Sequence, residues 1–95
     1  MAGGFVYMMA SKKGGTLYVG VTSDLAHRVD QHINGIGSTF TAKHGCKRLV
    51  WFEEHGEIER AITREKTIKK WPRQWKINAI EDANPLWNDL RHDLI

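Results

Sequence analysis

Two apolar runs separated by a short turn segment constrain the fold of this chain more than any other feature. Residues 5–10 and 16–22 are nearly unbroken runs of apolar, aromatic and β-branched side chains. Residues 11–15, between them, are serine, lysine and glycine, a composition typical of a turn. Because neither run alternates cleanly with polar residues, we predict a β-hairpin that is covered on both faces.

One helix and one further strand are predicted next. The helix is capped by Ser23 or Asp24 and stops at Gly35. Its apolar stripe comprises Leu25, Val29, Ile33 and Ile36. Residues 37–45 are predicted to form a polar loop with a possible short helical turn, and residues 47–54 are predicted to form the third strand.

Three helices are predicted after the third strand. The first spans about residues 57–70, the second begins at Pro72, and the third begins at Asn84-Pro85. The apolar side of the third helix comprises Leu86, Trp87, Leu90 and Leu94. The order β-β-α-β-α-α-α predicts an α/β (α+β) fold with a three-stranded antiparallel sheet flanked by helices. A chain of 95 residues has room for one core, so we expect a single domain over residues 1–95.

Basic side chains gather in one segment, although the net charge is only +3. Between positions 64 and 76, Glu65 is the only acid among Arg64, Lys66, Lys69, Lys70, Arg73 and Lys76. A one-sided basic segment is typical of a phosphate-binding face. Charge alone leaves a solvated helix surface open as the alternative interpretation.

The single cysteine and the absence of long apolar segments predict a cytoplasmic protein with no membrane partner. Cys46 has no second cysteine for an intrachain disulfide, which favours a reducing compartment. His44 lies close to it, but no partner pair follows at the spacing of a structural zinc site. Residues 5–10 are too short for a signal-peptide core, and no segment approaches membrane-spanning length.

Glu65 is the most informative residue, because it falls inside an apolar stripe. On the predicted helix it lies between Ala61 and Ile62 one turn before and Ile68 one turn after. An unpaired buried carboxylate costs several kcal/mol, so Glu65 needs a cationic partner, hydroxyl donors or a metal ion. A buried ion pair remains the alternative to a functional role.

Two cationic side chains and two tyrosines are expected to lie near one another. Arg28 and His32 are one helical turn apart and therefore share a helix face. If the hairpin turn is centred near residues 12–13, Tyr7 and Tyr18 lie opposite each other on one sheet face. Simple packing of the tyrosines, and a hydrogen-bonded His32 with no further role, are the alternatives.

These residues together resemble the GIY-YIG nuclease superfamily, whose name describes two tripeptides. The tripeptides Phe5-Val6-Tyr7 and Tyr18-Val19-Gly20 are similar to that pair. The match continues in the family's order with Arg28, His32, Glu65 in a lysine-rich helix, and Asn78. Phe5 replaces the first glycine and Val6 and Val19 replace the isoleucines, while a lysine found in some members after the first tyrosine has no counterpart here. The match is closest to short, free-standing members.

The resemblance implies a metal-dependent endonuclease that hydrolyses DNA phosphodiester bonds, as in excision-repair and homing endonucleases. Glu65 would hold one divalent ion, Mg²⁺ or Mn²⁺, and Tyr7 would act as the general base or position the water. Arg28 would clamp the phosphate, with Tyr18 and His32 beside it and Asn78 orienting the site. Expected DNA contacts are Lys43, Lys69, Lys70 and Arg73.

Two alternatives to this function remain open from the sequence. One is a nucleic-acid-binding module that keeps the fold without cleavage, and the other is an interaction domain in which Glu65 and Arg28 simply pair. A nuclease of this size would show little sequence preference, so a protein partner could supply specificity. We expect Tyr7, Tyr18, Arg28 and Glu65 to converge on one concave face of the sheet.

Overall fold

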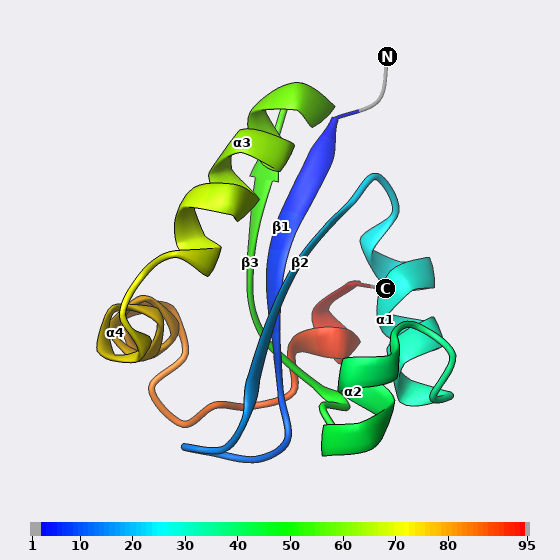
Figure 1. The fold of residues 1–95 in the computed structure, drawn as a ribbon, viewed down its shortest axis with the longest axis vertical. Helices are drawn as coiled ribbons and strands as arrows, with labels where there is room; N and C mark the ends of the chain where they lie inside the picture. Colours follow the sequence, from blue (N-terminus) through cyan, green and yellow to red (C-terminus); the bar gives the residue numbers. More distant parts are fainter. Residues whose placement is uncertain (1–2, 95) are drawn as a thin grey trace.

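A computed structural model describes residues 3–94 and contains a three-stranded antiparallel sheet (Figure 1). The strands are β1 (Gly4–Ala10), β2 (Leu17–Thr22) and β3 (Arg48–His55), in the spatial order β2-β1-β3. The central strand β1 is buried along almost its whole length. The predicted antiparallel sheet and the α+β fold class are confirmed.

The register of the hairpin differs by two residues from the prediction. Tyr7 pairs with Gly20, and Tyr18 pairs with Met9, so the tyrosines are diagonal neighbours and not opposite each other. The turn is longer than expected because residues 11–16 connect the strands, and the left-handed Gly14 (φ 70°) lies within it. Both side chains still emerge on the same face of the sheet.

Helices cover both faces of the sheet. Helices α1 (Leu25–Ile33) and α2 (Thr39–His44) lie on one side, and α3 (Ile58–Lys69) lies on the other (Figure 1). Asp24 caps α1, since its side chain accepts a hydrogen bond from the His27 backbone N–H. The edge strand β2 therefore runs between two helical layers.

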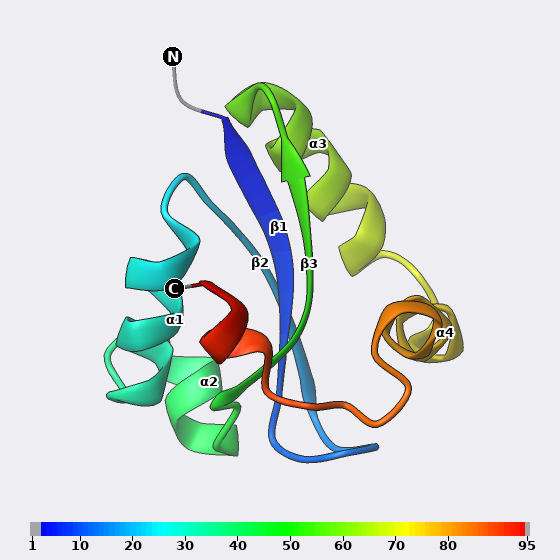
Figure 2. The ribbon, with the colours of Figure 1, turned by 180° about the vertical axis from the view of Figure 1, so that it is seen from behind.

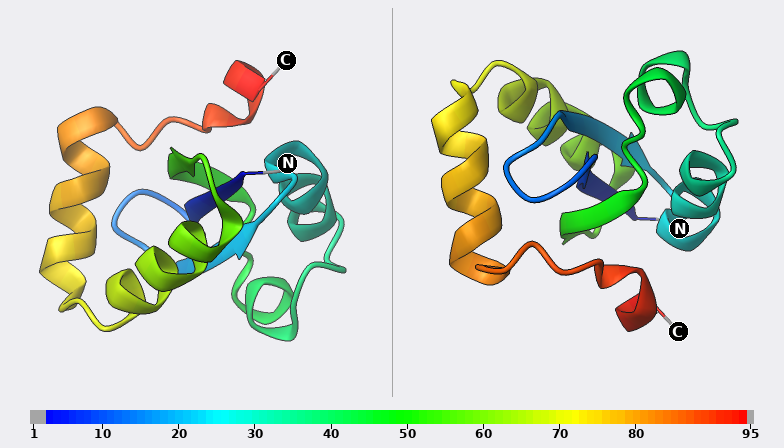
Figure 3. Two further views of the ribbon diagram at one scale, coloured as in Figure 1. Left: turned by 90° about the horizontal axis from the view of Figure 1, so that it is seen from above. Right: turned by 90° about the horizontal axis from the view of Figure 1, so that it is seen from below.

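The C-terminal part of the chain crosses from one layer to the other. Helix α4 (Arg73–Ala83) runs across the end of α3 (Figure 3), and a short 3₁₀ helix, η1 (Leu90–Leu94), packs beside α1 (Figure 2). No helix within residues 3–94 is long and apolar enough to cross a membrane.

The sheet separates two apolar clusters, which confirms the prediction of a hairpin covered on both faces. Under α3 the buried members are Val6, Met8, Ala10, Val19, Val50, Trp51, Ala61, Ile68, Ile80 and Trp87. Under α1 they are Tyr7, Met9, Leu25, Val29, Cys46 and Leu49. Alternate residues of β1 thus belong to different clusters, as the pleat of a strand requires.

Two local predictions differ from the structure. The short helical turn considered possible in residues 37–45 is a complete helix, α2, because Ser38 caps it and the left-handed Gly45 (φ 64°) ends it. The final segment is not an α-helix from Pro85 onward, since the left-handed Trp87 (φ 57°) interrupts the path and Leu86 is 65% exposed. Ile36, placed in the stripe of the first helix, is also exposed.

Asn84 explains why the final segment takes an irregular path. Its buried amide donates hydrogen bonds to the backbone carbonyls of Val50 and Asn88, and its carbonyl accepts one from the Asn88 N–H. One side chain thus fastens the chain after α4 to strand β3, and it satisfies backbone groups that a continuing helix would have used itself.

We predict that Asn84→Ala lowers the free energy of unfolding by about 1–3 kcal/mol, because it leaves buried polar groups without partners. Urea unfolding followed by circular dichroism measures this loss. Asn88→Ala is the matched control, since Asn88 is exposed and takes part through its backbone only. Equal losses in the two variants would contradict the role given to the Asn84 amide.

Candidate active site

The two tyrosines lie together on the α1 side of the sheet. The ring centres of Tyr7 and Tyr18 are 6.3 Å apart. Gly20, which pairs with Tyr7, makes this arrangement possible, because any side chain at this position would clash with the Tyr7 hydroxyl. The Tyr7 ring therefore lies across the edge strand β2, and its hydroxyl points toward α1.

Helix α1 brings a cation and an imidazole to the Tyr7 hydroxyl. His32 Nε2 lies 2.7 Å from the Tyr7 oxygen, and Arg28 Nε donates to the same oxygen at 3.4 Å. Because the helix repeats after about 3.6 residues, Arg28 and His32 project from adjacent turns of one face. The predicted neighbourhood of these four side chains is therefore present, although Tyr7 and His32 are fully buried.

Helix α2 provides the partner of the second imidazole nitrogen. His32 Nδ1 lies 3.0 Å from Thr41 Oγ1, and the Thr41 hydroxyl donates to the Ser38 carbonyl oxygen. The Thr41 hydroxyl oxygen also lies 2.8 Å from Ser38 Oγ. With the Thr41 proton directed to the Ser38 carbonyl, Thr41 accepts from Nδ1–H and His32 accepts the Tyr7 proton at Nε2, and this is the tautomer that we assign. Tyr7, His32, Thr41 and Ser38 then form one chain of hydrogen bonds.

Burial keeps both members of the Tyr7–His32 pair neutral. Desolvation raises the pKa of Tyr7 to about 12, although the Arg28 hydrogen bond acts in the opposite direction. Desolvation and the nearby Arg28 charge lower the pKa of His32 to about 4. A phenol and an imidazole with these values hold a hydrogen bond between neutral groups at neutral pH.

Sequence reasoning missed Ser38, Thr41 and Gly37 as parts of this cluster. A side chain at Gly37 would clash with the His32 ring, so glycine is needed there. The signal was available in principle, because a buried histidine needs partners for both ring nitrogens and hydroxyl residues follow the first helix. It was obscured because the segment was expected to be a loop.

Glu65 projects from α3, on the opposite side of the sheet from the tyrosines. Its neighbours in the apolar stripe, Ala61 and Ile68, belong to the cluster under α3. Arg64, the residue before Glu65, donates a hydrogen bond from Nε to the Glu53 carboxylate of β3 at 3.0 Å. Successive helix positions differ by about 100°, so Glu65 lies on the opposite flank of α3, toward β2.

Contrary to the prediction, the four side chains do not share one face of the sheet. Tyr7 and Arg28 are hydrogen-bonded and the Tyr18 ring packs against Tyr7, whereas Glu65 lies on the other side of the edge strand β2. The open edge of β2 between α3 and α1 faces the viewer in Figure 1. A substrate that contacts both groups would have to lie along this edge.

The Glu65 carboxylate is 7% exposed and binds Lys69 Nζ at 2.7 Å. The alternative of an ion pair is thus correct in kind, but its expected partner was wrong. Arg28 contacts Tyr7 and the Gln31 side chain, and no ion pair links it to Glu65 among residues 3–94. Lys69 itself is half exposed and can turn toward solvent.

Glu65 is the residue best suited to hold a metal ion. Within the part of the chain that the structure describes, no group of three or more histidine, cysteine or acidic side chains comes together. An ion at Glu65 would have fewer than three such side chains as ligands and would take water and phosphate oxygens at its other positions. Mg²⁺ commonly binds in this way.

The remaining predicted residues lie farther from the tyrosines. Asn78 is exposed on α4 and accepts a hydrogen bond from Gln74. Arg73 donates to the carbonyl oxygens of Gly14 and Gly15 in the hairpin turn. Lys43 and Lys70 are exposed on α2 and just after α3, whereas Val6 and Val19 are buried on the α3 side. The structure does not bring Asn78 into the tyrosine group.

Comparisons with known proteins found one family and several relatives. A family model described as the GIY-YIG catalytic domain matches residues 3–78. A UPF0213 protein of Clostridium perfringens is 37% identical over 80 residues, which cover 84% of this chain and 85% of the relative. A UPF0213 protein of Staphylococcus epidermidis is 35% identical, with 83% and 95% covered. A GIY-YIG domain-containing protein of Invertebrate iridescent virus 6 is 33% identical, with 82% and 80% covered. No solved structure matches.

The lowered pKa of His32 predicts a loss of stability in acid. Between the ordinary value of 6.5 and about 4, the unfolded chain binds a proton at this histidine and the folded chain does not. The contribution is therefore present above pH 6.5 and is lost as the pH falls, by about 3 kcal/mol at pH 4. Chemical unfolding from pH 7 to pH 4 measures it.

His32→Gln is the matched variant, because it removes the titrating group. Its free energy of unfolding should change less with pH than that of the wild type over this range. Parallel pH profiles for the two proteins would show that His32 is not held neutral by the fold.

Proposed function

This chain belongs to the GIY-YIG catalytic-domain family, and on that premise we propose that it is a metal-dependent endonuclease that hydrolyses DNA phosphodiester bonds. The family is a superfamily of nucleases. The observation that supports the proposal most is the hydrogen-bonded group of Tyr7, Arg28 and His32, with the Tyr18 ring packed against it beside the β2 edge and the Glu65 carboxylate across that edge. Simple sheet packing does not require such a concentration of polar groups.

We assign the general base to Tyr18. Tyr7, to which the resemblance gives this role, is fully buried and has a raised pKa, so it cannot reach a water molecule on the surface. Tyr18 is only partly buried and neighbours both Tyr7 and the Arg28 guanidinium. Arg28 would stabilise the phenolate of Tyr18, and Tyr7 would act as a positioning residue that holds Arg28 and His32 in place.

Arg28 serves as the phosphate clamp in this scheme. Its guanidinium has five N–H donors. Nε donates to Tyr7 and Nη1 donates to Gln31. The other donors remain to bind a phosphate oxygen. Burial works against the charge of Arg28 and is the largest single effect, but the interactions with Tyr7 and Tyr18 together outweigh it and raise the pKa of Arg28. The cation is therefore present at every physiological pH.

Glu65 would hold the divalent ion, which we propose to be Mg²⁺ or Mn²⁺. When bound, such an ion neutralises charge on the phosphate and stabilises the leaving oxygen. In the hydrolysis, the water oxygen bonds to phosphorus, the phosphorus–O3′ bond breaks and Tyr18 takes the water proton. The leaving oxygen takes a proton from solvent. Lys69, displaced from Glu65, would then be free to contact a phosphate.

DNA would be held through its phosphates with little sequence preference. The exposed Lys43 and Lys70 and the released Lys69 offer such contacts, whereas Arg73 is already bonded to the hairpin turn. We also propose a cytoplasmic location, on the single free thiol of the buried Cys46. A protein partner would be the source of any specificity, and a role in DNA repair fits an enzyme of this type.

Glu65→Gln tests the proposed metal ligand. We expect cleavage of plasmid DNA in Mg²⁺ to fall by about 10³-fold or more, because the charge that holds the ion is lost. Stability should change by no more than about 1 kcal/mol, since the Lys69 partner is half exposed. Glu59→Gln, on the exposed face of the same helix, is the control and should cut normally. A folded Glu65→Gln protein that cuts at the wild-type rate would rule out the assignment.

Two tyrosine variants separate the base from the positioning residue. Tyr18→Phe should reduce the cleavage rate by about 10²- to 10⁴-fold with little change in stability. Tyr7→Phe should lower the free energy of unfolding by about 1–3 kcal/mol, because the buried His32 Nε2 loses its donor. Nicking rates and urea unfolding of both variants give the comparison. A larger rate loss for Tyr7→Phe, with unchanged stability, would return the base role to Tyr7.

A further inference from the structure

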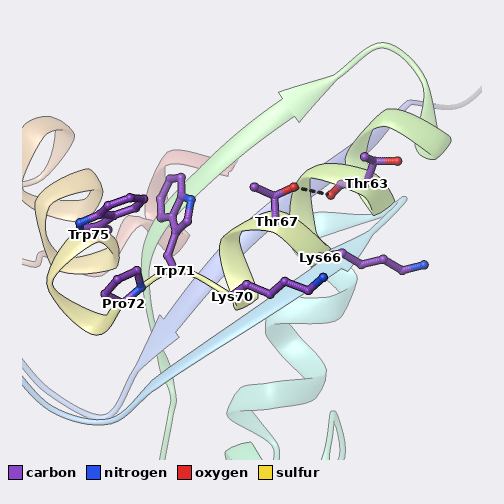
Figure 4. Close-up of a pocket in the computed structure, with 7 residues that line it drawn as sticks. All are labelled: Thr63, Lys66, Thr67, Lys70, Trp71, Pro72 and Trp75. Carbon is purple, nitrogen blue, oxygen red and sulfur yellow. Dashed lines mark hydrogen bonds between the residues drawn. The ribbon is translucent and has the colours of Figure 1, made fainter.

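A groove of about 590 Å³ lies between the outer surface of α3 and the start of α4 (Figure 4). Its aromatic end is formed by Trp71 and Trp75, and its basic end by Lys66 and Lys70. The groove is on the solvent side of α3, so it is separate from the tyrosine group on the other face of the sheet. Of the residues that line it, the function proposed above uses only Lys70, as a phosphate contact.

The aromatic end presents one open indole. Trp75 is 56% exposed, and its ring meets that of Trp71 edge to face, with 6.3 Å between the centres. The Arg64 guanidinium lies over the Trp71 ring, at 5.2 Å, so this second indole already has a partner. The exposed face of Trp75 is therefore the place where a planar ligand could stack. A large aromatic side chain exposed beside a groove is typical of a binding surface.

The basic end carries two lysines without partners. Of the basic segment described above, Arg64 pairs with Glu53, Lys69 pairs with Glu65, and Lys76 donates to a backbone carbonyl. No hydrogen bond or ion pair holds Lys66 or Lys70 within residues 3–94. Figure 4 shows both ammonium groups directed away from the indoles, along the groove. They can therefore bind anionic groups at a distance from the stacked ring.

Two threonines line the wall between these ends. The Thr67 hydroxyl donates to the Thr63 carbonyl oxygen, and the Thr63 hydroxyl donates to that of Glu59. Both hydroxyl protons are used inside the helix, which leaves oxygen lone pairs facing the groove. Such a wall accepts hydrogen bonds from amino groups, as found on nucleobases, and offers no proton to a phosphate.

The groove adjoins the proposed cleavage site. Lys66 follows Glu65 directly, and Lys70 follows the Glu65-bound Lys69. The surface of α3 that lines the groove is therefore next to the surface of α3 that faces β2. A strand whose phosphate lies at the β2 edge would reach the groove within a few nucleotides.

We propose that this groove binds an unpaired nucleotide of a single-stranded nucleic acid segment next to the cleaved bond. The base would stack on Trp75, and the neighbouring phosphates would contact Lys66 and Lys70. Bases in an intact duplex have their faces covered by neighbours, so only unpaired ones can occupy the groove. This inference rests on the proposed function and adds a substrate class to it, namely DNA with a single-stranded segment.

The test measures binding in chelator, where cleavage does not interfere. Fluorescence anisotropy would compare labelled oligo(dT), an abasic strand of equal length and a matched duplex. We expect Trp75→Ala to weaken oligo(dT) binding by about 5- to 150-fold, the range for loss of one stacked base. Binding of the abasic strand and the duplex should be unchanged, and Trp75→Phe should restore most of the loss. Leu86→Ala, at another exposed apolar residue, is the control.

A second variant tests the basic end and does not alter any aromatic contact. The double substitution Lys66→Ala with Lys70→Ala should reduce the slope of log K against log salt for oligo(dT) by about 1.4. Unchanged oligo(dT) affinity in Trp75→Ala, or an equal loss on the abasic strand, would overturn the proposal. So would an acidic peptide that binds the wild type in preference to oligo(dT).

These outcomes are independent of the proposed reaction. If the wild type fails to nick any DNA in Mg²⁺ while Trp75→Ala selectively loses oligo(dT) binding, the proposed endonuclease function is wrong and the proposed binding role of the groove is retained. If the wild type nicks DNA and the Trp75 and lysine variants bind oligo(dT) as it does, the groove assignment fails alone.

Discussion

The hydrogen bond between Tyr7 and His32 is the interaction on which the arrangement of this molecule depends. It joins the central strand β1 to α1 inside an apolar layer, and the second imidazole nitrogen extends the link to α2 through Thr41. A buried polar chain of this kind is stable only if every member has its partner. The positions of two helices, the glycines at 20 and 37 and the orientation of Arg28 all follow from that requirement.

A second constraint arises because the candidate site spans two layers. The tyrosines and Arg28 belong to the layer under α1, whereas Glu65 belongs to the helix on the other side of the sheet. Only the edge strand β2 separates them. Because Gly20 has no side chain, the Tyr7 ring can lie across this strand, and the two groups approach the same edge. Each layer can therefore be packed independently, while the chemistry is assembled at their common border.

Much of this arrangement could be predicted from the sequence, and the failures have physical causes. Unbroken apolar runs predicted the strands, and the position of Glu65 within an apolar stripe predicted that this carboxylate is buried. The predicted register of the hairpin was wrong because the sequence of the turn segment does not determine how many residues the turn contains, since each of its lysines and glycines could occupy the bend. Helix α2 was missed because its cap, Ser38, and its stop, Gly45, are also common loop residues. The irregular end depends on Asn84 contacting β3, a tertiary interaction that local patterns do not reveal.

The contact between Arg73 and the hairpin turn changes how that turn should be regarded. Exposed turns are usually the places where a protein accepts inserted residues most easily. Here the carbonyl oxygens of Gly14 and Gly15 hold the guanidinium of Arg73, which follows Pro72 at the start of α4. A longer or shorter turn would move the acceptor atoms and release the first turn of α4, which also carries Trp75. The length of an exposed loop thereby determines the geometry of a surface formed by a distant part of the chain.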